Sequence, residues 1–263
     1  MSRLDRRALF TSGAAAALLS AAGMSAQAQP RRGGTLRIAV QRRQAPCPIE
    51  LGACYETLTD IGADGVLRPL LATRWDSADG RNWQITLRDD ALFHDGTPVT
   101  AQAVVDSLAP RFLYLSARDD VTLDLLLPSV SPNLPWQLAD LSLSVRGPAD
   151  VGSGFYRLKD RSAGGHFLAD RVTPHHRDGE GGWADRVQVV AIPNAAVRAE
   201  ALRDGHVDVA ELPAREGLRG RFQYHPSETD AALVARLEVA VPPRVSDHAP
   251  LDGGRLAERW GLV

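Results

Sequence analysis

Short segments in which apolar and polar residues alternate constrain the fold of this chain more than any other feature. In Thr35–Val40 and in residues 82–88 every second side chain is apolar, which is the period of a strand with one buried face. Residues 186–192 are apolar on both faces, as in a strand buried within a sheet. A short strand is predicted around Asp208 and a last one at residues 236–241.

Helical signals lie between these strands. Thr100 is a good N-cap for a helix over residues 101–108, and Asn194 for one over residues 195–204. A further helix is predicted at residues 49–59. The chain is therefore predicted to be a mixed α/β protein.

Two segments are expected to be less regular. Residues 162–182 carry several glycines and a proline and predict an exposed loop with one edge strand. Prolines at positions 110, 128, 132 and 135 lie within residues 106–150, which are predicted to form a loop with one or two strands.

Composition excludes several classes of protein. The chain has 263 residues, 44% of them apolar, which is enough to bury a core. Its 30 basic and 32 acidic residues give a net charge of −2, which argues against a dedicated nucleic-acid binder. Only two cysteines are present, so neither a disulfide scaffold nor a thiolate zinc cage is expected.

Residues 1–28 predict a signal peptide. Arginines stand near the start, residues 13–24 form an uncharged run rich in Ala and Leu, and residues 26–28 (AQA) fit a cleavage site. Arg6 and Arg7 resemble a twin-arginine export signal, and an ordinary secretory signal is the alternative. The run is shorter than the roughly 20 apolar residues that span a bilayer, so the prediction is a periplasmic protein without a membrane span.

A few side chains are of types that perform chemistry. His94 and Asp95 are adjacent; they predict a turn, with a general base or metal ligand as the alternative. His175 and His176 are expected to be an exposed pair in a solvated loop, with surface metal pickup as the alternative. Ser153 stands between two glycines but lacks the strand–turn–helix context of a nucleophile elbow. These residues do not support an enzyme, and neither a cofactor nor a resident metal is predicted.

The cysteines leave two alternatives open. Cys47 and Cys54 are seven residues apart in a chain predicted to enter an oxidising compartment. They form either a small-loop disulfide or two free, partly buried thiols.

The motifs, taken in order, resemble the extracellular solute-binding proteins of family 5, which serve peptide, nickel and opine ABC importers. The matching segments cover most of residues 33–212, in the order of the family: GGTLRIA at 33–39, YETL at 55–58, LRPLLATRW at 67–75, FHDGTPVTA at 93–101, VGSGFYRL at 151–158, IPN at 192–194 and ALRDGHVDVA at 201–210.

This resemblance implies a non-catalytic protein in which two lobes close on a solute, such as a peptide or a nickel chelate, and present it to an ABC permease. It implies a lobe of the type II periplasmic-binding-protein fold, a mixed sheet flanked by helices with a reduced subdomain. In relatives, backbone following the opening strand often lines the crevice. The corresponding ligand candidates here are Arg42, Arg43, Gln44 and Cys47, with a solvated loop as the alternative.

Length departs from the family pattern, because its members generally run about twice as long as this chain. The resemblance therefore implies a single lobe over residues 29–263, a compressed subdomain inserted at 58–150, and no second lobe. Three alternatives follow: a degenerate or truncated binding protein, a lobe completed by a second polypeptide or a self-dimer, or a repurposed scaffold. The alternative function is a non-transport periplasmic interaction or accessory module built on a degenerate lobe.

Overall fold

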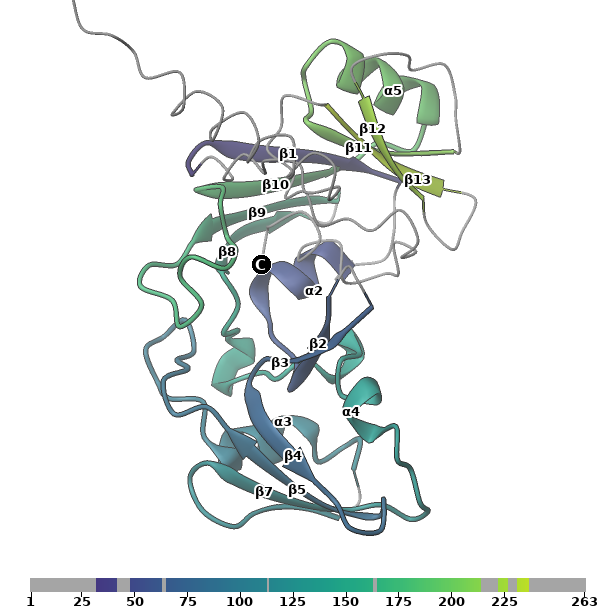
Figure 1. Ribbon diagram of the computed structural model, residues 1–263. Helices are drawn as coiled ribbons and strands as arrows, with labels where there is room; N and C mark the ends of the chain where they lie inside the picture. Colours follow the sequence, from purple (N-terminus) through teal and green to yellow (C-terminus); the bar gives the residue numbers. More distant parts are fainter. Residues whose placement is uncertain are drawn as a thin grey trace, which may run out of the picture.

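The computed structural model describes residues 32–41, 48–62, 65–112, 114–162, 165–213, 222–226 and 231–236 (Figure 1). Its strands are β1 Thr35–Val40, β2 Thr59–Ile61, β3 Leu67–Pro69, β4 Ala72–Asp76, β5 Asn82–Leu87, β6 Tyr114–Ala117, β7 Thr122–Leu126, β8 Tyr156–Ser162, β9 His166–Arg171, β10 Arg186–Ala191, β11 Val209–Pro213, β12 Phe222–Pro226 and β13 Ala231–Arg236. Its helices are α2 Pro48–Cys54, α3 Ala101–Leu108, α4 Leu134–Gln137 and α5 Ala195–Arg203, with 3₁₀ turns at Leu141–Leu143 and Pro148–Asp150.

A seven-stranded mixed sheet forms the upper part of the molecule in Figure 1. Its order is β12-β13-β11-β1-β10-β9-β8. β1 pairs in parallel with both β10 and β11, whereas the remaining pairs of this sheet are antiparallel. The three parallel strands thus end at the same edge of the sheet.

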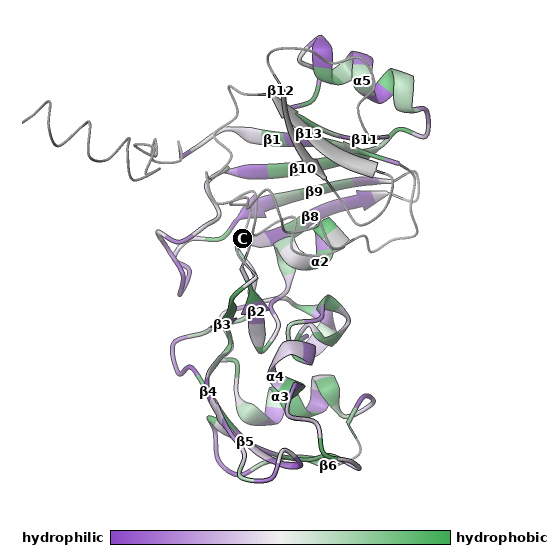
Figure 2. Ribbon diagram, turned by 45° about the vertical axis from the view of Figure 1, so that its right-hand side comes forward, coloured by the Kyte–Doolittle hydropathy of each residue, from purple (hydrophilic) through white to green (hydrophobic). Residues whose placement is uncertain are grey.

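Helices cover both faces of the parallel strands because those strands are apolar on both sides. Ile38 of β1 is fully buried in the cluster that includes Ala53 of α2. The next residue, Ala39, points to the other face and packs in the cluster that includes Leu202 of α5. Figure 2 shows both hydrophobic and hydrophilic residues along α5, and its buried residues are Arg198, Ala199 and Leu202.

A four-stranded antiparallel sheet, with order β4-β5-β7-β6, forms the lower part of the molecule. α3 packs on its apolar face, so Val104 and Leu108 lie in one buried cluster with Ile85 and Leu123. The hydroxyl of Thr100 accepts the Ala103 N–H at 3.2 Å and fixes the start of α3, as the sequence predicts.

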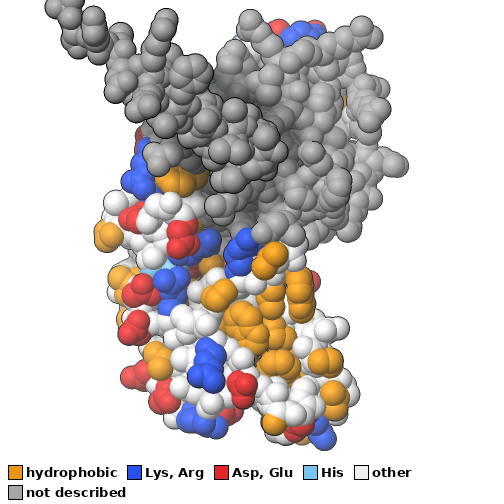
Figure 3. Space-filling view, in the orientation of Figure 1, with side chains coloured by type: hydrophobic (Ala, Val, Ile, Leu, Met, Phe, Trp, Pro, Cys, Tyr) orange, Lys and Arg blue, Asp and Glu red, His pale blue; other side chains and the backbone are white. Residues whose placement is uncertain are grey.

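Large apolar side chains are also exposed on this lower part. Val130 is 65% and Trp136 45% exposed. The space-filling view shows hydrophobic side chains gathered around the position of α4 (Figure 3). An apolar patch on a protein surface is often a site of contact with another molecule.

Most of the predicted elements are confirmed. β1, β5, β10, α3 and α5 lie where the sequence places them, and β6 and β7 are the strands predicted within residues 106–150. The predicted strand at residues 236–241 falls, except for its first residue, outside the described part of the chain.

Two expectations were wrong. The helix predicted at residues 49–59 ends at Cys54, because the following residues bridge to Val145 and then form β2. Residues 162–182 are not an exposed loop with an edge strand: β9 lies between β10 and β8 inside the sheet, and His175 is buried. Partners from distant segments cover these residues, which local composition cannot reveal.

Among the described residues, no helix has the length and apolar character needed to cross a bilayer.

Candidate functional site

The edge where β1, β10 and β11 end is the first candidate site. Ligands of open α/β sheets bind outside the carboxyl ends of parallel strands, where the strand order switches direction. β1 is such a point, since the chain passes from β10 through α5 to β11 on its other side. The predicted ligand residues Arg42, Arg43, Gln44 and Cys47 follow β1, but they lie outside the described residues.

Buried charges organise this edge. A carboxylate oxygen of Glu211 accepts the backbone N–H of Gln41 at 3.0 Å, directly before the predicted ligand segment. The Arg198 guanidinium, on a residue only 3% exposed, donates to the carbonyl oxygens of Glu211 and Ile192 at 2.5 Å each and of Pro193 at 3.0 Å. These bonds satisfy carbonyl groups at the ends of β10 and β11 and hold the edge in one conformation.

Glu56, His175 and His176 form a second candidate site, here called the glutamate–histidine cluster. One ligand atom of each residue lies within 4.8 Å of those of the other two. The side chains of His176 and Glu56 are 1% and 3% exposed, and His175 is 9% exposed. The prediction of an exposed, solvated histidine pair was therefore wrong.

Packing and hydrogen bonds explain this burial. The His175 ring lies 4.1 Å from the Phe155 ring on one side and 4.1 Å from the His176 ring on the other, measured between centroids. His175 Nε2 is 2.9 Å from the Ser153 carbonyl, and its Nδ1 accepts the Arg177 N–H at 3.1 Å. A carbonyl only accepts and an amide only donates, so the proton is on Nε2. Burial lowers the pKa of His175 to about 4, which keeps the ring neutral.

Glu56 is the charge at the centre of the cluster. His176 Nε2 lies 3.2 Å from Oε1 and 3.1 Å from Oε2, and the Ser153 hydroxyl donates to Oε2 at 3.0 Å. Arg177 Nη1 lies 3.7 Å from Oε1. Burial alone would raise the pKa of Glu56, but the hydrogen bond from His176 and the nearby positive charge hold it well below its usual range. The carboxyl group is therefore an anion held by donors.

The Gly152–Gly154 segment runs through this site and leaves no room for a side chain at either glycine. A Cβ on Gly152 would lie 1.8 Å from the Cys54 carbonyl oxygen, and one on Gly154 would lie 2.6 Å from that of Ala53. Ser153 itself is fully buried. It precedes β8 rather than a helix, and its hydroxyl is bonded to Glu56, so it is not placed as a nucleophile.

His94 and Asp95 form a turn, as predicted. Asp95 accepts the Thr97 N–H at 3.0 Å, and Gly96 takes the left-handed conformation with φ of 88°. The buried His94 ring has its Nε2 2.7 Å from the Gly154 carbonyl. Burial lowers the pKa of His94, so the ring serves as a neutral hydrogen-bonding group in the wall of the cluster.

Cys54 is a free, buried thiol, and Cys47 lies outside the described residues. Burial raises the pKa of the Cys54 thiol to about 12. It is therefore neither a nucleophile nor a metal ligand at neutral pH.

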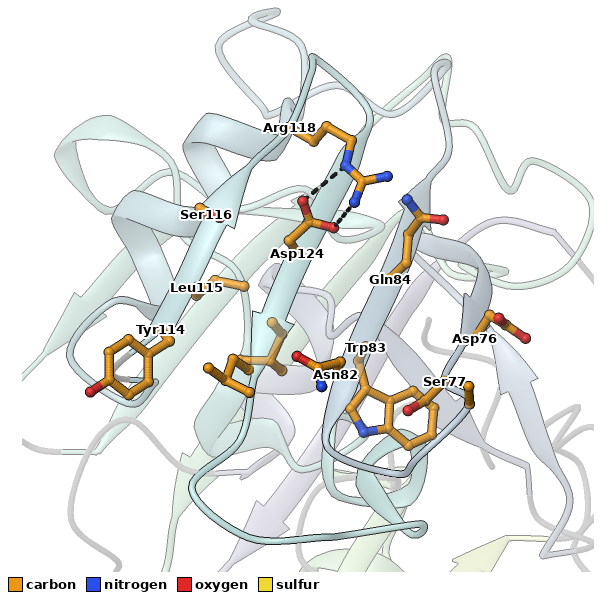
Figure 4. A pocket seen from close by; sticks show the side chains of 13 residues that line it. Asp76, Ser77, Asn82, Trp83, Gln84, Tyr114, Leu115, Ser116, Arg118 and Asp124 are labelled. Carbon is orange, nitrogen blue, oxygen red and sulfur yellow. Dashed lines mark hydrogen bonds and ion pairs between the residues drawn. The ribbon is translucent and has the colours of Figure 1, made fainter.

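A shallow groove of about 670 Å³ lies on the four-stranded sheet (Figure 4). The exposed ends of β5, β6 and β7 line it, with Tyr114 at one side and the ion pair of Arg118 and Asp124, 2.8 Å apart, at another. Arg118 and Asp124 are already paired with each other, and exposed side chains such as Tyr114 line the groove. The groove thus lacks the buried, convergent polar groups of a ligand site.

The seven-stranded sheet, with parallel strands at its centre and helices on both faces, gives this chain the fold of a type II periplasmic binding protein. A solved nickel ABC transporter structure from Bacillus halodurans has a TM-score of 0.63 at 23% identity, covering 73% of this chain and 47% of that one. DppA from Helicobacter pylori, solved with the peptide STSA, has a TM-score of 0.63 at 20% identity, covering 69% and 47%.

Sequence comparison adds a similarity to one family within this class. Residues 66–119 match the family model of bacterial extracellular solute-binding proteins, family 5 Middle. The probable D,D-dipeptide-binding periplasmic protein DdpA of Escherichia coli (strain K12) is 29% identical over 187 residues, covering 60% of this chain and 36% of that protein. The chain is therefore similar to the family 5 solute-binding proteins.

This chain spans 36% of DdpA and about half of the solved relatives.

Sequence reasoning missed the glutamate–histidine cluster. Glu56 was noticed only within a family motif, and the histidines follow it 119 and 120 residues later. Spacing carries no signal over such a distance. The cis peptide bond at Thr173-Pro174, directly before the histidines, was equally invisible.

Proposed function

We propose that this chain is a periplasmic solute-binding component, or a reduced relative of one, of a peptide- or nickel-type ABC transporter. It binds a small solute without catalysis and delivers it to a permease. The observation that carries the proposal is the edge of β1, β10 and β11. Glu211 there binds the Gln41 N–H, directly before Arg42 and Arg43, and Arg198 binds the Glu211 carbonyl.

The chemistry of this edge suggests how the solute is held. Arg42 and Arg43 would bind a carboxylate, such as the C-terminus of a short peptide or the carboxylates of a metal chelate. Gln44 and Cys47 would contribute hydrogen bonds and packing. We further propose that the other side of the crevice is supplied from outside the described residues, by another polypeptide or by a second copy.

Calorimetric titration of the full chain with peptides of about two to five residues and with a nickel–histidine chelate tests this proposal. The double variant Arg42→Gln, Arg43→Gln is expected to lose about tenfold or more in affinity for a carboxylate-bearing solute. Arg74→Gln is the matched control, because Arg74 is exposed on β4, in the other sheet, and should leave affinity unchanged. Full affinity in the double variant would exclude these ligand residues.

The export prediction needs its own test. Residues 1–28 fused to a reporter that is active only in the periplasm should direct export, and changing both Arg6 and Arg7 to Lys should abolish it if the twin-arginine route is used. Export that survives the change would favour an ordinary secretory signal.

The exposed apolar side chains around α4 favour the second candidate, a periplasmic accessory module that docks another protein (Figure 3). Trp136→Ser would then weaken a complex isolated from periplasm, whereas solute binding would be unaffected. A monomeric chain that binds a solute and captures no companion would exclude this function.

A further inference from the structure

We propose that the glutamate–histidine cluster binds one divalent transition-metal cation of the Zn²⁺ or Ni²⁺ kind. The ligands would be Glu56, His175 and His176. They come from two segments far apart in sequence that the fold brings within 4.8 Å of one another. One carboxylate and two imidazoles form a ligand set typical of such cations. The site goes beyond the proposed solute binding.

The hydrogen bonds of His175 are those of a metal ligand with its outer shell in place. Its Nε2–H donates to the Ser153 carbonyl, which fixes the tautomer and the orientation of the ring. Metal-bound histidines usually make such a bond with their second nitrogen. The lone pair on Nδ1 now accepts the Arg177 N–H at 3.1 Å, and this hydrogen bond would be given up to the cation.

Glu56 and His176 are already spaced for a shared cation. His176 Nε2 lies 3.1 Å from a carboxylate oxygen. Two ligand atoms at tetrahedral angles and about 2.0 Å from a zinc ion are about 3.3 Å apart. The cation would replace the Nε2 proton that His176 now donates to Glu56, and the neutral ring would then carry its proton on Nδ1. The Ser153 hydroxyl would remain bonded to the carboxylate and orient it.

The positive charge of Arg177 opposes a cation at this site. Its guanidinium lies 3.7 Å from Glu56 and also binds Glu180, its Nε being 3.1 Å from a carboxylate oxygen of Glu180. A divalent ion would bring like charge beside it in a buried site, which weakens binding. This opposition allows a test. Removal of Arg177 should tighten cation binding if the cluster is a metal site, whereas it should only destabilise a cluster that is held together by hydrogen bonds alone.

The glutamate–histidine cluster is separate from the edge of the sheet where β1, β10 and β11 end. β9 runs antiparallel to β10, so the chain leaves β9 at the edge opposite to the carboxyl ends of β1, β10 and β11. A cation here would join the segment after α2 to the segment after β9. It would be a resident ion of the lobe rather than a transported solute.

The experiment uses the full chain without a histidine tag, stripped with a chelator and titrated with Zn²⁺ by calorimetry and with Co²⁺ by visible absorption. Saturation at one cation per chain, with the intense bands of four-coordinate Co²⁺, is expected. His176→Gln should weaken binding about hundredfold, and Ser153→Ala about tenfold. Arg177→Gln should tighten it about tenfold or more. His166→Gln is the matched control: this histidine also pairs with a carboxylate, at 3.6 Å from Asp160, but on the exposed part of the sheet.

Three results would overturn the proposal. One is the absence of saturable binding by the unchanged protein. Another is binding that His166→Gln removes, which would place the cation on the surface. The third is weaker cation binding in Arg177→Gln when circular dichroism shows that the variant is folded. The cluster would then be a structural set of hydrogen bonds rather than a metal site.

Discussion

Replacing Gly152 by alanine should destabilise the protein by about 3–5 kcal/mol. The added Cβ would lie 1.8 Å from the Cys54 carbonyl oxygen, whereas ordinary contact begins at 3.4 Å. The two backbone segments would have to separate by about 1.6 Å, since neither is the flexible end of a side chain. Backbone conformation adds nothing to this cost, because Gly152 does not have a positive φ.

The magnitude follows from what that separation disrupts. The Cys54 carbonyl accepts the Gly154 N–H at 3.0 Å, and the Gly152 carbonyl accepts the His94 N–H at 2.8 Å. Each of these hydrogen bonds contributes about 1 kcal/mol, and overpacking of a tight interior adds about 1–3 kcal/mol. A domain of ordinary stability, about 5–15 kcal/mol, would lose a large part of it.

Urea unfolding followed by circular dichroism measures the change in the free energy of unfolding. Gly96→Ala is the matched control: a Cβ there would meet nothing within 4 Å, but φ is 88°. It should cost only about 1–2 kcal/mol, from backbone strain. If Gly152→Ala proved no more costly than Gly96→Ala, the close approach of the two segments would be refuted.

Three other predictions test the packing around the sites. In a Cys47→Ser variant, Cys54 should resist a thiol reagent at about pH 8 until the protein is unfolded, because the thiol is buried and protonated; rapid labelling of folded protein would contradict this. Arg198→Met should cost about 3 kcal/mol by leaving three carbonyl groups without their donor, whereas Arg203→Met, exposed on the same helix, should cost under about 0.5 kcal/mol in urea unfolding. Burial raises the pKa of Tyr156, so the folded protein binds the phenolic proton more tightly than the unfolded chain does. As pH rises past about 10, the phenol of the unfolded chain loses its proton first, and the free energy of unfolding falls. Unfolding at about pH 8 and about pH 11 should therefore show a smaller loss for Tyr156→Phe than for the unchanged protein; equal losses would contradict the assignment.

Local signals predicted the elements whose causes are local. Thr100 and Asn194 are the N-caps of α3 and α5 because a side-chain oxygen next to the first turn is sufficient to begin a helix. Alternation predicted β1 and β10 because these strands have enough apolar residues to be buried.

Burial of polar residues was beyond local reasoning. His175 lies in a segment rich in glycine and charge, and only the distant Phe155 and Ser153 make it a buried side chain. The same holds for Glu56, whose anionic state depends on partners from beyond β9. A site whose residues come from segments far apart in the sequence can be recognised only once the fold is known.

The position of β1 has a consequence for the order in which the protein folds. β1 is the earliest strand described, yet both of its neighbours, β10 and β11, come from residues 186–213. The four-stranded sheet closes within residues 72–126 and involves far shorter loops. Because long loops are slow to close, we expect the four-stranded sheet to form first. β1 can pair only after β10 and β11 have been synthesised. During that interval the apolar strand β1 has both of its edges unpaired. We therefore expect the nascent chain to bind chaperones.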